Sequence, residues 1–376
     1  MSGAVRHLYV HLPFCAHRCG YCDFVTVVGR GGVHEQYVDG LLGELELEGA
    51  ALAPQLETVF LGGGTPSFTE ADALRRLLER LPAAEEVTVE ANPETVTAGM
   101  AQLLLDSGVT RVSLGAQSFR SHLLRVLERR AGPDDVRRAF YHLRDASFDN
   151  ISLDLLYGIP GQSAADLERD IEEALALAPE HISYYELEAK AGTRFAYAHG
   201  AELERQAEAM EGYFESVIGR LTAAGYRWYE TANFCLAPAR AGGRDLRARH
   251  NLAYWLGRDY LGLGIGAVST LGDQRWRTTP RLNVYLAALG RGELPPREIE
   301  PLGVGVRAQE RVMLGLRLDV GLPFGSAEPS LDRAALERLE RSGLATRRTE
   351  GDGQETLVLT PRGRRLGGAV TAELLA

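Results

Sequence analysis

The 376-residue sequence is poor in cysteine, in positive charge and in long apolar runs, and each shortage excludes a class of protein. Four cysteines are too few for a disulfide scaffold in a chain of this length. No apolar run is long enough to span a bilayer, and the N-terminal stretch MSGAVRHLYVHLPF lacks the layout of a signal peptide. We therefore expect a cytoplasmic protein.

Acidic residues outnumber basic ones. The chain has 51 Asp and Glu against 41 Lys and Arg, which gives a formal net charge of −10. Because clustered cations drive binding to phosphate backbones, we expect no nucleic-acid partner. One local exception is the arginine-rich stretch ARAGGRDLRARH (239–250), which is either a solvated loop or a patch for an anionic ligand.

The remaining composition is that of a globular protein with a large core, since 45% of the residues are hydrophobic and 24% are charged. Strand patterns alternate with helical ones, and such alternation predicts a parallel α/β sheet. Six strand–helix units predict a partial (β/α)6 TIM-type barrel, whose function gathers at the carboxyl ends of the strands. The expected strands are 7–12, 56–64, 86–93, 111–117, 150–161 and 181–189.

The rest of the chain predicts two further parts beyond the barrel, which we assign to residues 1–200. Residues 201–300 form an extension, with a long helix expected over 203–225 and a strand over 226–234. Residues 301–376 form a smaller α+β domain of winged-helix type. In that domain EGDGQ (350–354) is typical of a hairpin turn.

Three of the four cysteines stand in one short segment with the spacing C-x3-C-x2-C, at Cys15, Cys19 and Cys22. A structural zinc site usually takes two pairs of ligands, so His11 and His17 would have to complete such a set. A [4Fe–4S] cluster normally takes four thiolates, and three would leave one iron open for an exchangeable small molecule. Both metals remain alternatives, although the polar surroundings favour ligands over buried structural thiols.

Polar and glycine residues follow several of the expected strands. The loop FLGGGTPS places Gly63 and Gly64 at a strand end, where free N–H groups can face the charged end of a ligand, or where the chain simply turns. Glu90 in EANP can accept hydrogen bonds from a ribose or an ammonium group, or form a surface ion pair. Asp154 interrupts an apolar strand, so its carboxylate needs a ligand or an arginine partner.

The cysteine motif, with Tyr21 before its last cysteine, resembles that of the radical S-adenosylmethionine (SAM) superfamily. The resemblance implies a [4Fe–4S] cluster on the three cysteines and SAM chelated to the open iron. In that superfamily an electron from the cluster cleaves SAM to a 5′-deoxyadenosyl radical. Tyr21 would pack on SAM, and the implied SAM contacts are Tyr9, Gly63, Gly64, Thr65, Glu90, Gln117, Arg129 and Asp154.

The order of motifs VHLPFC, LGGGTPS, EANPE, SLGAQSF, DLLYGIPGQ and HNLAYW resembles the oxygen-independent coproporphyrinogen III oxidase, or HemN-like, group. Two features are closer to the HemW haem chaperones of that group. Phe24 stands where the true oxidase carries a further cysteine, and HNLAYW matches an HNxxYW signature taken to bind haem. The resemblance implies a haem site on His250, Asn251, Tyr254 and Trp255, with His250 as axial ligand; without it, the segment would be an aromatic core with a satisfied histidine.

We therefore expect an iron–sulfur and SAM-binding haem chaperone that passes haem to an acceptor protein, such as a respiratory enzyme at the membrane. The alternative is a radical enzyme that decarboxylates a porphyrinogen, against which the missing cysteine at Phe24 counts, and a third hypothesis is a zinc module. The sequence departs from the family pattern at Ala131 and Val268, where histidine is common.

Overall fold

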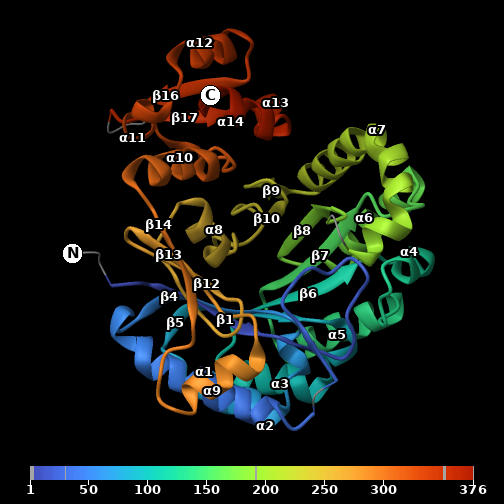
Figure 1. Cartoon of the computed structure of the whole chain (residues 1–376). Coiled ribbons are helices and arrows are strands. Elements are labelled where there is room, and N and C mark those ends of the chain that lie inside the picture. Colours follow the sequence, from blue (N-terminus) through green and yellow to red (C-terminus); the bar gives the residue numbers. More distant parts are fainter. Residues whose placement is uncertain (1–3, 30, 191–192, 350–352, 376) are drawn as a thin grey trace.

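The computed structural model describes residues 4–29, 31–190, 193–349 and 353–375. Its main sheet has nine strands in the order β11-β1-β4-β5-β6-β7-β8-β10-β9 (Figure 1). The central six run parallel and confirm the predicted partial (β/α)6 barrel. They are β1 (His7–Leu12), β4 (Leu56–Gly63), β5 (Ala84–Ala91), β6 (Arg111–Gln117), β7 (Ile151–Tyr157) and β8 (His181–Glu186).

At least one α-helix lies between each of these strands and the next, and another follows the last of them. β6, RVSLGAQ, is buried at every position but its last, as expected for a parallel strand that is covered on both faces. A capping box starts one helix, because Ser163 Oγ accepts from the Asp166 N–H and the Asp166 carboxylate accepts from the Ser163 N–H. The helices are α1 (His34–Glu48), α2 (Ala71–Arg80), α3 (Ala98–Asp106), α4 (Ser121–Val126), α5 (Pro133–Asp145), α6 (Ala164–Leu177) and α7 (Arg194–Ala223).

Later segments extend the barrel sheet at both edges. β11 (Leu261–Leu263) pairs in parallel with β1, and the antiparallel pair β9 (Tyr226–Trp228) and β10 (Asn233–Leu236) continues the sheet beyond β8. The prediction of one strand over 226–234 is therefore wrong. The chain turns within this range because the Glu230 carboxylate accepts the Ala232 N–H and the Trp228 indole N–H donates to the Thr231 carbonyl.

Residues 249–301 add a helix that carries the HNLAYW motif and a second, antiparallel sheet in the order β12-β13-β14. Short strands and single-turn helices also surround the cysteine loop and the strand ends. The elements are α8 (Arg249–Trp255), β12 (Val268–Leu271), β13 (Gln274–Thr278), α9 (Leu282–Leu289), β14 (Arg297–Pro301), β2 (Phe14–Cys15), β3 (Val27–Val28), η1 (Gly49–Ala51), η2 (Pro66–Phe68) and η3 (Pro93–Thr95).

The C-terminal region has its own apolar core, which includes Val312, Leu316 and Leu357. Figure 1 shows this region beyond α8, on the far side of the molecule from α1, α2 and α9. Its elements are α10 (Val304–Gly315), β15 (Leu322–Pro323), α11 (Phe324–Ala327), η4 (Glu328–Ser330), α12 (Arg333–Arg341), β16 (Ala345–Thr349), β17 (Glu355–Leu359), α13 (Pro361–Arg365) and α14 (Gly367–Leu375).

Two predictions concern this half of the chain. β16 and β17 pair antiparallel on either side of the expected hairpin turn, but residues 350–352 of that turn lie outside the described residues. The expected boundaries at 200/201 and 300/301 lie inside α7 and β14, and the division into three parts remains a prediction. The two final helices, α13 and α14, were not predicted.

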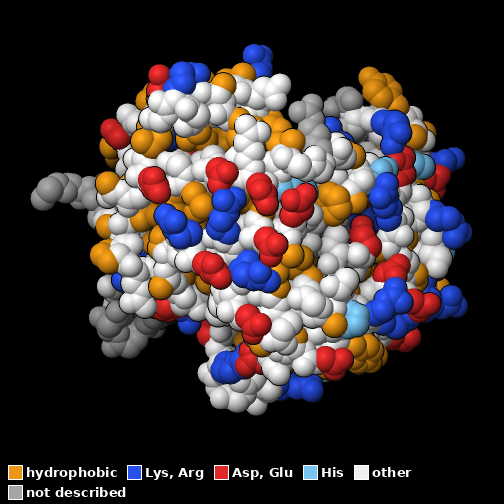
Figure 2. All heavy atoms as spheres, turned by 90° about the horizontal axis from the view of Figure 1, so that it is seen from below, with side chains coloured by type: hydrophobic (Ala, Val, Ile, Leu, Met, Phe, Trp, Pro, Cys, Tyr) orange, Lys and Arg blue, Asp and Glu red, His pale blue; other side chains and the backbone are white. Residues whose placement is uncertain are grey.

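The outer surface below the barrel carries both signs of charge. Figure 2 shows acidic and basic side chains interspersed on this face. No helix in the described ranges is both long and apolar enough to cross a membrane.

Candidate functional site

The parallel sheet brings most of the predicted SAM residues to one end of the barrel. The pairing places Leu12 beside Gly63 and Glu90 beside Ser113. It also places Asp154 beside Gly115, two residues before Gln117 at the end of β6. Residues more than a hundred positions apart therefore share one edge, as expected for parallel strands.

The cysteine loop follows β1 and lies against the glycine-rich loop. Cys15 is buried at the end of β2, and its Sγ lies 3.4 Å from Thr65 Oγ1. Cys19 and Cys22 are partly exposed on a turn, which is closed by a hydrogen bond of 3.2 Å from the Cys22 N–H to the Cys19 carbonyl. Burial raises the pKa of Cys15 to about 11 and also raises the pKa of Cys22. A metal that takes these groups must therefore replace their protons.

The guanidinium of Arg129 places a positive charge beside the cysteine loop. Arg129 Nη1 lies 3.8 Å from Cys19 Sγ, and Arg129 also interacts with Tyr21, whose ring packs edge-on against Phe195 of α7. Three thiols on one loop beside a buried guanidinium fit an anionic cluster with three protein ligands.

Of the two histidines that the zinc alternative needs, His11 is engaged in hydrogen bonds, whereas His17 is partly exposed. His11 Nδ1 lies 3.0 Å from the Tyr9 hydroxyl and His11 Nε2 lies 2.8 Å from the Val25 carbonyl oxygen, so both ring nitrogens are engaged. Across the described ranges, no three His, Cys, Asp or Glu side chains converge on one point as ligands of a single ion. Zinc requires that convergence, whereas a cubane cluster binds each thiolate through a different iron.

The glycine-rich loop is a packing element. The N–H groups of Gly63, Gly64 and Thr65 donate to Glu90 Oε2 (3.1 Å), the Leu12 carbonyl (2.8 Å) and the Phe14 carbonyl (2.8 Å). A Cβ at Gly64 would lie 2.5 Å from the Pro13 carbonyl group, closer than any real contact. The expectation of free N–H groups is thus wrong, because these residues instead fix the glycine loop against the cysteine loop.

Asn92 connects the two loops and was not predicted. Its Nδ2 donates to Thr65 Oγ1 at 2.9 Å, and its Oδ1 accepts from Arg129 Nη2 at 2.9 Å. Arg129 Nη2 also donates to the Gly115 carbonyl at 2.8 Å. The signal in the sequence was a side-chain amide two residues after Glu90, at the end of the same strand.

Two carboxylates lie inside the barrel. Burial, and then the charge of Asp154, raises the pKa of Glu90 to about 7. Burial also raises the pKa of Asp154, which accepts from Ser113 Oγ at 2.9 Å. Arg111, a second residue that was not predicted, attracts both acids electrostatically but forms no ion pair with either. Such a pair of acids suits a ligand that carries positive charge.

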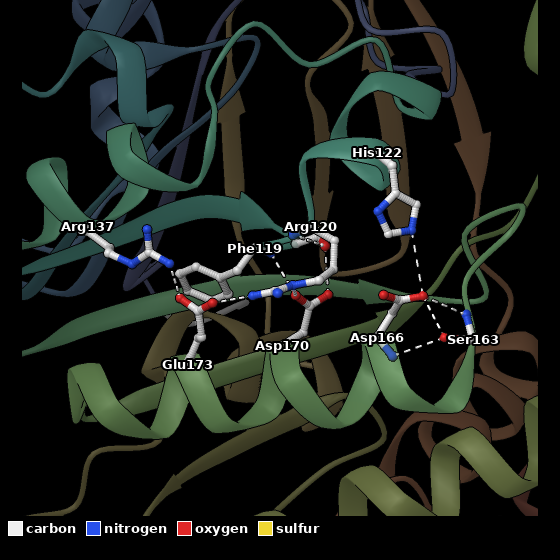
Figure 3. A network of polar contacts seen from close by, with 9 residues as sticks. Phe119, Arg120, His122, Arg137, Ser163, Asp166, Asp170 and Glu173 are labelled. Carbon is white, nitrogen blue, oxygen red and sulfur yellow. Dashed lines mark hydrogen bonds and ion pairs between the residues drawn. The ribbon is translucent and has the colours of Figure 1, made fainter.

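The loop after β6 is held by α6. Gln117 has a φ of 64°, a left-handed conformation that costs about 1–2 kcal/mol in a residue other than glycine. The buried Asp170 carboxylate accepts from Ser118 Oγ (2.6 Å), the Phe119 N–H (2.7 Å) and Arg120 Nε (3.3 Å). Figure 3 shows Asp170 and Glu173 reaching from α6 toward this loop, while Asp166 faces His122 of α4. The network holds Gln117 at the barrel end.

His250 of the HNLAYW motif is sealed inside the protein. It is only 1% exposed, and its ring stacks on Phe60 at 5.1 Å between centroids. Its Nδ1 lies 2.7 Å from Thr58 Oγ1 and its Nε2 lies 2.9 Å from the Tyr254 hydroxyl. Burial lowers the pKa of His250 to about 3, so the ring is neutral. An axial-ligand role therefore requires the bond to Tyr254 to open.

The other three predicted haem residues, Asn251, Tyr254 and Trp255, line a cavity of about 820 Å³, inside the range of roughly 300–1,000 Å³ that small-molecule sites occupy. Its wall combines the edge of the barrel sheet, α8, α10 and the last two helices. A second cavity of about 350 Å³ adjoins the cysteine loop, and Tyr254 lines both. Residues of the second cavity include Tyr9, His11, Phe24, Tyr260, Val268 and Arg277.

Comparison with known proteins places the chain in a family. The model of the radical SAM superfamily matches residues 9–174. The haem chaperone HemW of Mycobacterium tuberculosis is 38% identical over 390 residues, covering 100% of this chain and 96% of the relative. HemW of Bacillus subtilis is 32% identical over 396 residues, covering 99% of each, and HemW of Escherichia coli is 38% identical over 268 residues, covering 69% and 68%.

Among solved structures, the coproporphyrinogen III oxidase HemN of Escherichia coli superimposes with a TM-score of 0.75 at 20% identity, covering 99% of this chain and 91% of that one. At this identity the likeness shows a shared fold only. The relatives from Mycobacterium tuberculosis and Bacillus subtilis are more specific, since they match at more than 30% identity over at least 99% of the chain. The chain belongs to the HemW family of haem chaperones and carries a radical SAM domain.

Proposed function

We propose that the protein binds haem and transfers it to an acceptor protein. The main support is that Asn251, Tyr254 and Trp255 of the HNLAYW motif line an 820 Å³ cavity in a chain whose full-length relatives are named haem chaperones. The cavity is lined by the edge of the barrel sheet and by the C-terminal helices, so we expect its cargo to pass to a second protein at this junction.

The cavity wall suits a flat, largely apolar ring system. Aromatic side chains provide stacking faces, and they prefer partners that are planar and extended. The aromatic residues of the wall are Tyr157, Tyr184, Tyr185, Phe214, Trp228, Tyr254 and Trp255.

His250 remains our proposed axial ligand of the haem iron. It is neutral, as ligation requires, and its Nε2 is hydrogen-bonded to the hydroxyl of Tyr254, which lines the cavity. Binding of haem would therefore exchange the Tyr254–His250 hydrogen bond for a bond to iron, while Thr58 keeps Nδ1 in place.

We further propose that Cys15, Cys19 and Cys22 hold a [4Fe–4S] cluster, which when bound supplies the electron for SAM cleavage. Arg129 would offset the thiolate charge near Cys19. Glu90 and Asp154 would face the positive charge of SAM. The remaining contacts, from Tyr9, Tyr21, Gly63, Gly64, Thr65 and Gln117, stay as predicted, with the two glycines acting through packing.

An anaerobic haem titration of the purified protein, followed by absorbance, tests this function. We expect tight binding by the wild type, and weaker binding with an altered Soret band in His250→Ala. His122→Ala, which removes a half-exposed histidine of α4, should behave as the wild type. No binding by the wild type would refute the chaperone proposal, whereas unchanged binding by His250→Ala would refute only the axial-ligand role.

A further inference from the structure

The 820 Å³ cavity gathers polar atoms that have no partner. Of the 17 buried side-chain nitrogen and oxygen atoms that lack a hydrogen bond among the described residues, five belong to residues of this wall. Native proteins satisfy most buried polar groups, so such a concentration indicates a missing ligand. The five atoms are Tyr184 Oη, Asn233 Oδ1, Trp255 Nε1, Arg364 Nε and Arg364 Nη2.

Two of these atoms form one functional edge of Arg364. The Nε and Nη2 side of a guanidinium is the fork that holds both oxygens of a carboxylate. Elsewhere in the chain Arg227 uses this edge on Asp319, with distances of 2.6 and 3.0 Å, and Arg347 uses it on Glu340, with distances of 2.8 and 3.0 Å. Arg364 donates only through Nη1, to the Trp228 carbonyl at 2.9 Å.

The Arg364 guanidinium lies on the Trp228 ring, and its Nε and Nη2 edge has no partner. Its guanidinium carbon lies 3.7 Å from the centroid of the Trp228 ring, and burial lowers its pKa to about 10. The acids that attract it are committed elsewhere: Asp319 binds Arg227, and Glu230 accepts from Asn233. A partly buried guanidinium with two shielded, unpaired N–H groups is stabilised by an anion that accepts from both.

None of the acids of the cavity wall occupies the fork of Arg364. The three carboxylates of the wall already have partners inside the protein, since Glu186 accepts from Tyr157, Glu188 pairs with Lys190, and Glu230 bonds Asn233. Of its arginines, Arg365 pairs with Glu215.

The third arginine of the wall, Arg317, forms no ion pair within the described ranges and lies over the ring of Trp255, in the HNLAYW motif, at 5.1 Å. Arg364 and Arg317 are therefore the two arginines of the wall that have no carboxylate partner among the described residues.

We propose that Arg364 is the carboxylate-binding residue of the cavity and that it receives a haem propionate through its Nε and Nη2 edge. This inference rests on the proposed haem function. Because both atoms are shielded from water in this conformation, the side chain must turn on its Trp228 support as the propionate enters. Arg364 belongs to α13, so the C-terminal region supplies part of the haem site and does not merely cover it.

The test compares haem with haem dimethyl ester, in which both propionates are neutral, on the full-length protein. The wild type should bind haem at least tenfold more tightly than the ester, since a hydrogen-bonded charge pair is worth about a tenfold change or more. Arg364→Met should lose most of that preference while binding the ester as the wild type does. Arg362→Met, which removes an exposed arginine of the same helix, is the matched control.

Iron-free protoporphyrin IX separates this role from ligation to iron: Arg364→Met should weaken its binding and His250→Ala should not. If Arg364→Met unfolds, Arg364→Lys keeps the charge but not the fork and should lose part of the preference. Equal binding of haem and ester by the wild type, or equal weakening of both by Arg364→Met, would overturn the inference and leave the haem function intact. A wild type that binds neither would overturn both.

Discussion

Glu90 should destabilise the empty protein at neutral pH, and Glu90→Gln measures by how much. Its pKa is raised from 4.5 to about 7 by burial and by Asp154. The folded state therefore holds the proton more tightly than the unfolded state does. Stability from this group is complete below about pH 4.5 and is lost as the pH rises through about 7.

The raised pKa of Glu90 sets how much the unfolding free energy changes with pH. A difference of about 2.5 pKa units corresponds to roughly 3 kcal/mol, and because water reaches part of the Glu90 side chain we expect about 1–3 kcal/mol. Glutamine cannot ionise, yet it keeps an oxygen for the Gly63 N–H. Glu90→Gln should thus match the wild type near pH 4.5 and exceed its unfolding free energy by that amount at pH 8.

Urea unfolding of the cluster-free protein between pH 4.5 and 8, followed by circular dichroism, makes the comparison. Glu94→Gln, at an exposed glutamate four residues further on, should follow the wild-type profile. Identical pH profiles for the wild type and Glu90→Gln would refute the reasoning, since the raised pKa would then contribute nothing to stability. The same variant should bind SAM more weakly if Glu90 faces its positive charge.

Two further variants test the cysteine ligands and the Asp170 hydrogen-bond network. Cys19→Ala should lose most of the bound iron and visible absorbance, while its far-ultraviolet circular dichroism stays that of the wild type. Cys235→Ala, at a buried thiol outside the loop, should keep its iron. Full iron content in Cys19→Ala would contradict the ligand assignment. Asp170→Ala leaves Ser118 Oγ, the Phe119 N–H and Arg120 Nε without an acceptor, although Arg120 Nη2 keeps Glu173, so it should lower the unfolding free energy by about 3–5 kcal/mol in urea. A loss no greater than in Asp134→Ala, at an exposed acid, would show that the network is not needed.

The barrel was predictable because short stretches of sequence specify each of its strands and helices. Each parallel strand is a short apolar run between helical patterns, and the strand ends then bring the chemical residues together by register alone. The break at Glu230 was not predictable from such patterns, because it depends on a side chain that turns its own backbone.

Side-chain environments were the part that the sequence could not settle. The burial of His250 depends on Thr58, which is 192 residues away, and no local pattern reveals that partner. Asn92 and Arg364 are ordinary polar residues in sequence, and only the three-dimensional arrangement shows that one joins two loops and that the other has an empty fork.

The position of β11 has a consequence for the order in which the protein assembles. β1, which leads into the cysteine loop, has β11 as its outer neighbour, and β11 comes from residues 261–263. On the ribosome, β1 therefore remains an unprotected edge strand until more than two thirds of the chain has been made, and exposed edges invite wrong pairing. The HNLAYW helix, α8, precedes β11 in the chain, so the sheet beside the cysteine loop is complete only after this helix has been synthesised.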